Sequence, residues 1–102
     1  MAAPTAKALM RSRYVAYVLG LESYLLATWH PSTRPAELKL DEGPPRWLGL
    51  AIKHHELQDD NHATVEFVAR YKIDGRAYRL HETSRFVREE GRWFYIDGDI
   101  QA

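Results

Sequence analysis

The dipeptide Asp74-Gly75 constrains this chain most, because it lies between two runs in which apolar and polar residues alternate. A type I′ turn needs positive φ at both of its central residues, and Asp-Gly is a strong signal for that turn. Residues 65–73 and 76–88 are therefore predicted to form two antiparallel strands joined by a two-residue turn.

The two-residue turn also sets the register of this hairpin. Five pairs are predicted to share one face: Tyr71–Tyr78, Ala69–Leu80, Phe67–Glu82, Val65–Ser84 and Ala63–Phe86. Most of these residues are apolar, so this face is predicted to cover the core. Glu82 and Ser84 are polar, however, and they lie on the same face.

The residues before position 40 predict helices. Thr5 is the expected N-cap of an amphipathic helix that ends at Gly20, because glycine suits the left-handed position after a helix. A second short helix is predicted from Glu22 to about Trp29, and Pro35 is expected to open one more helical turn. The chain thus begins with two or three helices.

Two further strands are predicted from alternating residues, one beginning at Arg46 and one over residues 92–97. A four-residue loop over 58–61 is expected to end the first strand, and a three-residue loop over 89–91 to precede the last. The pattern indicates an α+β domain in which a curved antiparallel sheet of about four strands packs on the N-terminal helices.

The expected loop over residues 58–61 decides which side of the first strand faces the core. It turns Leu48 and His54 inward, together with Leu50 and Ile52, and it places His54 beside Val65. A loop one residue shorter or longer would turn the neighbouring histidine inward instead.

Length and composition exclude several classes of function. A chain of 102 residues is expected to form one domain, and the absence of cysteine excludes disulfides and thiolate zinc sites within it. Lys plus Arg equals Asp plus Glu at 14 each, which argues against a dedicated nucleic-acid-binding protein. No apolar run approaches the ~20 residues that span a membrane, and no signal peptide is recognisable, so a cytoplasmic protein is expected.

The sharpest catalytic hypothesis combines His54, Glu82 and Ser84 on the apolar face. A carboxylate in apolar surroundings is suited to general acid–base work, and a nearby histidine would share its proton. The structural alternative is that Glu82 pairs with a buried group, for which Arg11 and Arg13 on the first helix are candidates.

A second group of candidates would bind a ligand. Trp29, His30 and Arg34 lie close together in the sequence and would clamp an anion, while Phe67 and Tyr71 would line an apolar pocket. The structural alternative is that Trp29 packs in the core, His30 caps a helix, and Arg34 pairs with an acidic residue.

The histidines do not predict a metal site. His54 and His55 are neighbours on a strand and therefore point to opposite faces, and only His62 lies within reach of His55. Asp97 and Asp99 are read as part of a polar chain terminus. No metal or other cofactor is expected.

Four segments resemble a known family: LMRSRYVAYVLG, YLLATWHPSTRP, WLGLAI, and the long run VEFVARYKIDGRAYRLHETSRFVREEGRWFYIDGD. They are similar to the middle domain of YchJ-like bacterial proteins, which belongs to the nuclear transport factor 2-like (NTF2-like) superfamily. The resemblance implies a conical α+β fold and no particular activity. Many relatives carry a cysteine-rich SEC-C zinc motif, whose cysteines this chain lacks.

Two classes of function remain open. The domain is expected to bind a small apolar or carbonyl-containing ligand or to mediate protein interaction, including a homodimer formed through the sheet with Trp47, Trp93 or Tyr95 as exposed contacts. The alternative is an acid–base enzyme of the isomerase, dehydratase or hydrolase type that uses Glu82 and His54.

Overall fold

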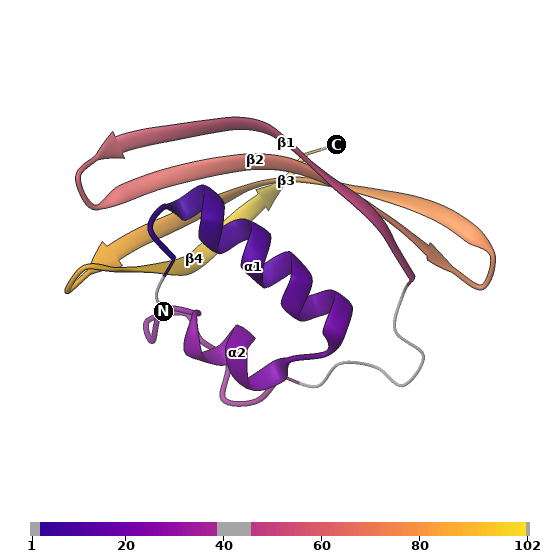
Figure 1. Ribbon diagram of the computed structural model, residues 1–102, viewed down its shortest axis with the longest axis horizontal. Coiled ribbons are helices and arrows are strands. Elements are labelled where there is room, and N and C mark those ends of the chain that lie inside the picture. The colour runs from indigo at the N-terminus through magenta and orange to yellow at the C-terminus, as the bar shows by residue number, and fades with distance from the viewer. Residues whose placement is uncertain (1–2, 39–45, 102) are drawn as a thin grey trace.

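The computed structural model describes residues 3–38 and 46–101, in which two helices precede four strands. The elements are α1 (Ala6–Leu19), α2 (Glu22–Ala27), β1 (Arg46–Asp59), β2 (His62–Ile73), β3 (Arg76–Glu89) and β4 (Arg92–Ile100). The strands form one antiparallel sheet in the order β1-β2-β3-β4. The sheet arches over α1, with α2 beneath α1 in the same view (Figure 1). The predicted α+β architecture is confirmed.

Helix α1 begins and ends where the sequence predicts. The Thr5 hydroxyl accepts a hydrogen bond from the Ala8 N–H at 3.0 Å, and Gly20 has a φ of 72° directly after the helix. Helix α2 ends at Ala27, earlier than predicted, because the backbone then pairs with β4. The backbone N–H of Tyr95 donates to the Thr28 carbonyl at 2.9 Å. The helical turn expected after Pro35 is absent, since residues 35–38 are not helical.

The central hairpin matches its prediction in full. Asp74 and Gly75 have φ values of 51° and 77°, which a type I′ turn requires. All five predicted pairs, from Tyr71–Tyr78 to Ala63–Phe86, are present between β2 and β3.

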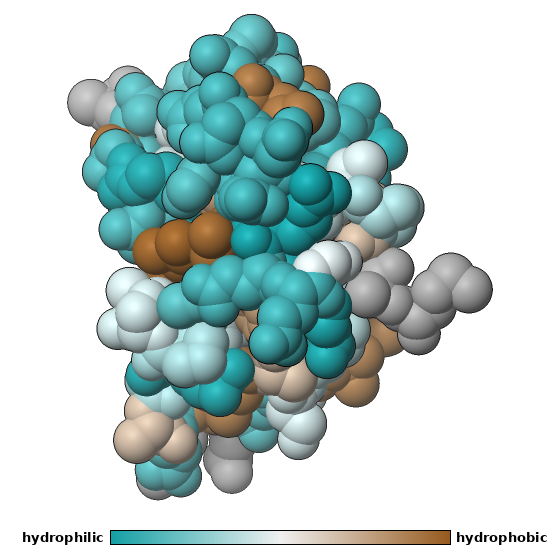
Figure 2. Space-filling model, turned by 90° about the vertical axis from the view of Figure 1, so that its left-hand side faces the viewer, coloured by the Kyte–Doolittle hydropathy of each residue, from teal (hydrophilic) through white to brown (hydrophobic). Residues whose placement is uncertain are grey.

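The other two hairpin loops are shorter than predicted. Asp59 pairs with His62, so the turn contains two residues and not four; the Asp59 carboxylate stabilises it by accepting the Asn61 N–H at 2.8 Å. The last hairpin also turns over two residues, and both Glu90 and Gly91 have positive φ. Seen from the end where these two turns lie, the surface is mostly hydrophilic (Figure 2).

Strand β4 is longer than predicted and continues to Ile100. Asp97 and Asp99 belong to this strand and not to a polar terminus. Both accept hydrogen bonds from Arg85 on β3, at 2.6 Å and 2.7 Å. These charged pairs hold the last residues of the strand against their neighbour.

Strand β1 departs most from its prediction, because its register shifts three times. A bulge adds one residue and turns the following side chains to the other face. One shift turns Trp47 inward and leaves Leu48 47% exposed, and the next pairs His54 with Glu66. The predicted inward positions of Leu48 and His54 are therefore wrong. Leu50 and Ile52 do pack against the core.

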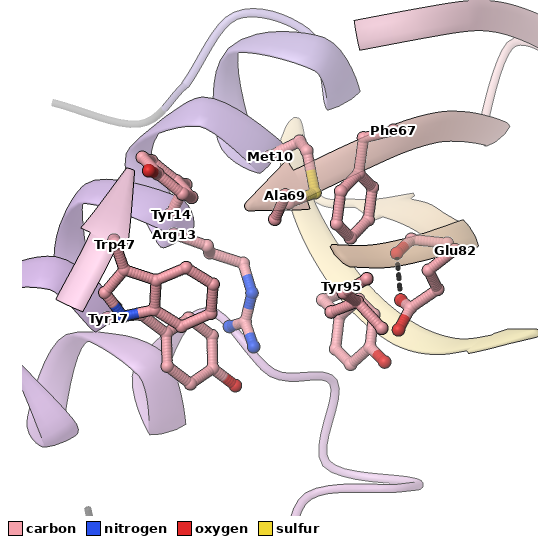
Figure 3. Close-up of a pocket in the computed structure, with 11 residues that line it drawn as sticks. Met10, Arg13, Tyr14, Tyr17, Trp47, Phe67, Ala69, Glu82 and Tyr95 are labelled. Carbon is pink, nitrogen blue, oxygen red and sulfur yellow. Dashed lines mark hydrogen bonds between the residues drawn. The ribbon is translucent and has the colours of Figure 1, made fainter. Parts of the chain in front are cut away.

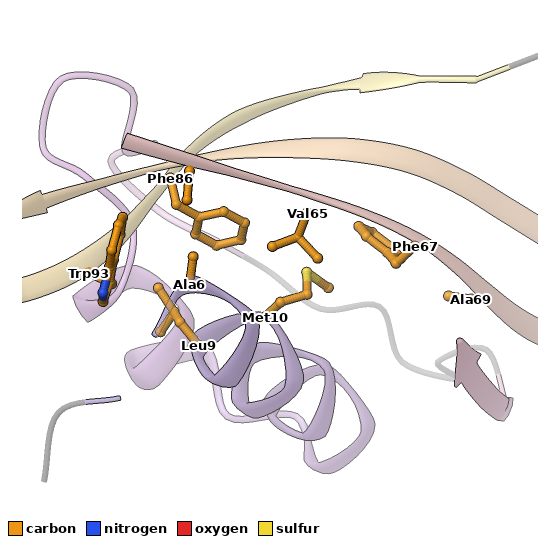
Figure 4. Close-up of a cluster of buried hydrophobic side chains, with 9 residues drawn as sticks. Ala6, Leu9, Met10, Val65, Phe67, Ala69, Phe86 and Trp93 are labelled. Carbon is orange, nitrogen blue, oxygen red and sulfur yellow. The ribbon is translucent and has the colours of Figure 1, made fainter. Parts of the chain in front are cut away.

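The core lies between α1 and the concave face of the sheet (Figure 4). Leu9 and Met10 from the helix meet Val65, Phe86 and other residues of the sheet. Each fully buried side chain of this size contributes about 1.5–3 kcal/mol to folding. The aromatic residues expected on an exposed dimer surface lie on this side too. Trp93 is only 8% exposed, and Trp47 and Tyr95 are half-buried against the core.

Candidate functional site

A cavity of about 270 Å³ lies beside the core, between α1 and the sheet. Most of its wall is apolar and comes from both layers: Met10, Tyr14, Trp47, Phe67, Ala69 and Leu80. Its polar lining is Arg13, Tyr17, Glu82, Ser84 and Tyr95 (Figure 3). An apolar wall with a few polar groups is typical of small-molecule sites.

Glu82 and Ser84 face the cavity from β3, as the hairpin register predicts. Ser84 is 1% exposed, and its hydroxyl donates to Glu82 Oε2 at 2.5 Å (Figure 3). Gly98 lies opposite Ser84 on β4, and a Cβ there would approach Glu82 Cδ to 2.8 Å. The missing side chain of Gly98 therefore makes the space that the Glu82 carboxylate occupies.

Arg13 is the most deeply buried charge on the cavity wall, with 3% of its surface exposed. Its Nη1 donates to the Leu25 carbonyl at 2.8 Å and to Thr28 Oγ1 at 2.6 Å. Both acceptors are uncharged. Within the described residues Arg13 forms no ion pair, so the predicted pairing with Glu82 is absent. Arg11, the other predicted partner, is exposed.

Aromatic rings surround the Arg13 guanidinium. Its Cζ lies 4.7 Å from the ring centre of Tyr95 and 5.2 Å from that of Trp29, which are cation–π distances. Burial lowers the pKa of Arg13, and the nearby phenols, Tyr17 and Tyr95 foremost, act against that decrease. The guanidinium thus lies in low-dielectric surroundings with aromatic neighbours.

Tyr95 stands between the two charged residues of the cavity. Burial, reinforced by the negative charge of Glu82, raises the pKa of the Tyr95 phenol to about 12, while Arg13 acts in the opposite direction. The phenol is therefore neutral at physiological pH and can donate a hydrogen bond there.

His54 lies away from this cavity. Its side chain is 62% exposed, and its Nε2 is 3.4 Å from Glu56 Oε2 on the same strand. The register shift after Ile52 is the cause, since it places His54 opposite Glu66. The structure brings Glu82 and Ser84 together but separates His54 from both.

The loop candidates are engaged with the protein itself. The two ring nitrogens of His30 contact Ser32 Oγ at 2.7 Å and Glu89 Oε2 at 2.9 Å, and Arg34 Nε donates to the Trp29 carbonyl at 2.9 Å. Trp29 packs edge-on against Tyr95, behind the cavity wall. Trp29 is half-buried against Tyr95, close to the packing role of the structural alternative. His30 does not cap a helix as that alternative expected, because its ring bonds Ser32 and Glu89. The described hydrogen bond of the Arg34 side chain goes to a carbonyl.

The two pocket candidates on β2 differ in position. Phe67 lines the cavity, whereas Tyr71 lies next to it, stacked on Tyr78 with ring centres 5.4 Å apart and in contact with Trp47.

The sequence reasoning missed Arg13 as a cavity residue, although a signal was present. Ala6, Leu9, Met10 and Ala16 are the buried apolar residues of α1, and Arg13 falls between them at the same three- and four-residue spacing. A charged residue on the buried face of an amphipathic helix indicates a functional or structural partner inside the fold.

A metal site and a membrane-spanning helix are both absent from the part of the chain that the structure describes. In residues 3–38 and 46–101, no three His, Asp or Glu side chains form a group able to hold a metal ion. Within the same residues, neither helix is long and apolar enough to cross a membrane.

Comparison with known proteins establishes the family. The model of a family described as YchJ, middle NTF2-like domain, matches residues 5–98. The chain belongs to this family. A UPF0225 protein of Bordetella pertussis is 63% identical over 99 residues, which are 97% of this chain and 74% of that protein. A UPF0225 protein of Chromobacterium violaceum is 63% identical over 100 residues, which are 94% of this chain and 74% of that protein.

Two solved structures share the fold of the YchJ middle domain seen here. A SEC-C motif containing protein from Rhodopseudomonas palustris matches with a TM-score of 0.75 at 30% identity, covering the whole chain and 83% of that protein. One from Psychrobacter arcticus matches with a TM-score of 0.78 at 28% identity, and the chain covers 64% of its length. The resemblance inferred from the four sequence segments is confirmed.

Proposed function

We propose that this domain binds a small organic molecule in the cavity between α1 and the sheet. The observation that carries the proposal is the convergence of Arg13, Glu82 and Tyr95 on walls that are mostly apolar. Such groups orient a ligand whose body is held by apolar contact. The cavity volume of about 270 Å³ is slightly below the range of about 300–1,000 Å³ that is typical for drug-sized ligands, so the ligand is of metabolite size.

Replacing each of two alanines by leucine, one inside the cavity and one outside it, tests the proposal. Ala69 is buried and lines the cavity, whereas Ala77 is exposed on the neighbouring strand. A library of small aromatic and aliphatic fragments is screened by thermal shift, in which a ligand at 100 times its Kd stabilises the native state by about 2.7 kcal/mol. Hits are then titrated by ¹⁵N NMR on wild type, Ala69→Leu and Ala77→Leu.

Ala69→Leu fills part of the cavity and is expected to weaken binding about tenfold or more, the loss that about 1.4 kcal/mol produces. Ala77→Leu should bind as wild type does. Equal affinity in Ala69→Leu, or the absence of any fragment that perturbs cavity residues, would reject the proposal.

A second candidate function is acid–base catalysis on a small carbonyl compound, now without His54. It is supported by Glu82, which faces the cavity, has no arginine partner among the described residues and accepts a hydrogen bond from Ser84. Glu82 would remove a proton next to the carbonyl, and the neutral Tyr95 phenol would donate to the carbonyl oxygen.

Deuterium exchange at the α-carbon of carbonyl fragments, followed by NMR, tests this candidate. Wild type is expected to accelerate exchange and Glu82→Gln to lose the acceleration, while Glu90→Gln on an exposed turn serves as the control. Exchange that is equally fast in Glu82→Gln would remove this residue from the mechanism.

A further inference from the structure

Within the described residues, Arg13 is a buried cation that no carboxylate pairs with. It is 3% exposed, and the described contacts of its Nη1 are to the uncharged oxygens of Leu25 and Thr28. Guanidinium has five N–H donors, so donors remain for a ligand beyond the contacts with Leu25, Thr28 and the Tyr17 phenol. The phenol of Tyr17 is a further neighbour, but no carboxylate in the described residues pairs with it.

Physical chemistry favours an anionic partner at this position. A charge held away from water is stabilised mainly by an opposite charge with good hydrogen-bond geometry, and the planar guanidinium fits a carboxylate through two parallel bonds. The Arg13 side chain reaches from α1 into the cavity, between Trp47 and Tyr17 on one side and Tyr95 on the other (Figure 3). The guanidinium therefore lies at the wall of the space that a ligand would fill.

Glu82 gives the cavity a second, opposite pole. Its carboxylate is fixed by Ser84 on the β3 wall, across the cavity from Arg13 (Figure 3). An ionised carboxylate is acceptor-only, so Glu82 attracts a hydrogen-bond donor and repels an anion. Phe67 belongs to the apolar wall on the Glu82 side of Arg13, and Trp47 to the apolar wall on the other side of Arg13 (Figure 3). A hydrocarbon alone would offer neither charge a hydrogen bond or an opposite charge.

We propose that the cavity recognises an amphipathic carboxylic acid whose carboxylate binds Arg13 and whose other end carries a hydroxyl or amino donor for Glu82. This inference rests on the proposed binding function and adds the chemical class of the ligand. Polarity at both ends and an apolar middle distinguish this class from simple hydrocarbons and from phosphorylated compounds, whose larger charge would approach Glu82.

Three closely matched probes test the inference on the unaltered chain. 4-Hydroxyphenylacetate has both the acid and the donor, phenylacetate lacks the donor, and 4-hydroxyphenylacetamide lacks the charge. Because a hydrogen bond to a charged group is about twice as strong as a neutral one, the amide is expected to bind about tenfold more weakly than 4-hydroxyphenylacetate, with phenylacetate between them. NMR titration of cavity residues gives the three Kd values.

Substitution of the arginine provides an independent readout. Arg13→Met should abolish the preference for acid over amide, while Arg11→Met, an exposed change on the same helix, should leave it intact. If Arg13→Met fails to fold, the Kd values of the three probes on the unaltered chain still decide whether the cavity prefers a carboxylate.

The outcomes separate the inference from the function on which it rests. If the amide binds within twofold of the acid, or Arg13→Met keeps the acid preference, the ligand class is wrong although the cavity remains a binding site. If the fragment screen and all three probes give no shift of cavity residues, both the ligand class and the binding function are wrong.

Discussion

Gly98 offers the sharpest test of the cavity wall, because its missing side chain makes room for Glu82. A Cβ at this position would approach Glu82 Cδ to 2.8 Å and Cγ to 3.1 Å, and the carboxylate oxygen more closely still. The far end of the Glu82 side chain is flexible, so Gly98→Ala is expected to displace the carboxylate and not the backbone. The hydrogen bond from Ser84 to Glu82, 2.5 Å in the native protein, would then be lost.

Two opposing contributions decide the sign of the stability change. Replacing glycine by alanine reduces the freedom of the unfolded chain and stabilises by about 0.4–1 kcal/mol where the backbone permits it. Loss of a hydrogen bond to a charged group costs about 1.5–3 kcal/mol, and we take the lower end because Glu82 is half-buried and water can replace part of the contact. Gly98→Ala should therefore destabilise the domain by roughly 0.5–1 kcal/mol.

The effect of Gly98→Ala on the free energy of unfolding should change sign once Glu82 is truncated. In a Glu82→Ala background the three clashing atoms are gone, so Gly98→Ala is expected to stabilise by about 0.4–1 kcal/mol. Urea denaturation of the four proteins, followed by tryptophan fluorescence, gives a coupling free energy of about 1.5 kcal/mol between the two sites. A coupling near zero, or a stabilised Gly98→Ala single mutant, would refute the described position of the Glu82 carboxylate.

Two further predictions concern the core and the sheet edge. Phe86 is 1% exposed, so Phe86→Ala should lower the free energy of unfolding of the domain by about 3–5 kcal/mol. Tyr78 is exposed, so Tyr78→Ala should lower it far less. Similar urea midpoints for the two variants would contradict the assignment of Phe86 to the core. The hydrogen bonds from Arg85 lower the pKa of the Asp99 carboxyl in the folded protein. The pair therefore stabilises the fold at pH values above the unfolded-state pKa of this carboxyl. The stabilisation is lost as the pH falls through the lower, folded-state pKa. In an NMR titration the Asp99 pKa should rise toward its ordinary value in Arg85→Gln, and an unchanged pKa would exclude the pair as its cause.

Local rules were sufficient for part of the site. The Asp74-Gly75 turn and the two-residue period of the flanking strands are short-range properties, and together they predicted the β2–β3 register and the shared face of Glu82 and Ser84. The cap at Thr5 is similarly local, because the side chain binds a backbone group three residues away.

Properties that depend on several elements were predicted less well. The face of His54 depends on bulges in β1, which adapt the strand to the curvature of the sheet and leave little trace in the sequence. The end of α2 depends on backbone pairing with β4, where Tyr95 donates to Thr28.

The sequence by itself determined the α+β class, the central hairpin and one polar wall of the cavity, because turn chemistry and side-chain periodicity act over a few residues. Only the tertiary structure decided the opposite wall. Arg13 is buried, and no carboxylate of the described residues pairs with it. The end of α2 supplies its uncharged acceptors, and the aromatic rings of Trp29 and Tyr95 lie against it. Those groups lie far from Arg13 in sequence, and only the folded chain brings them together.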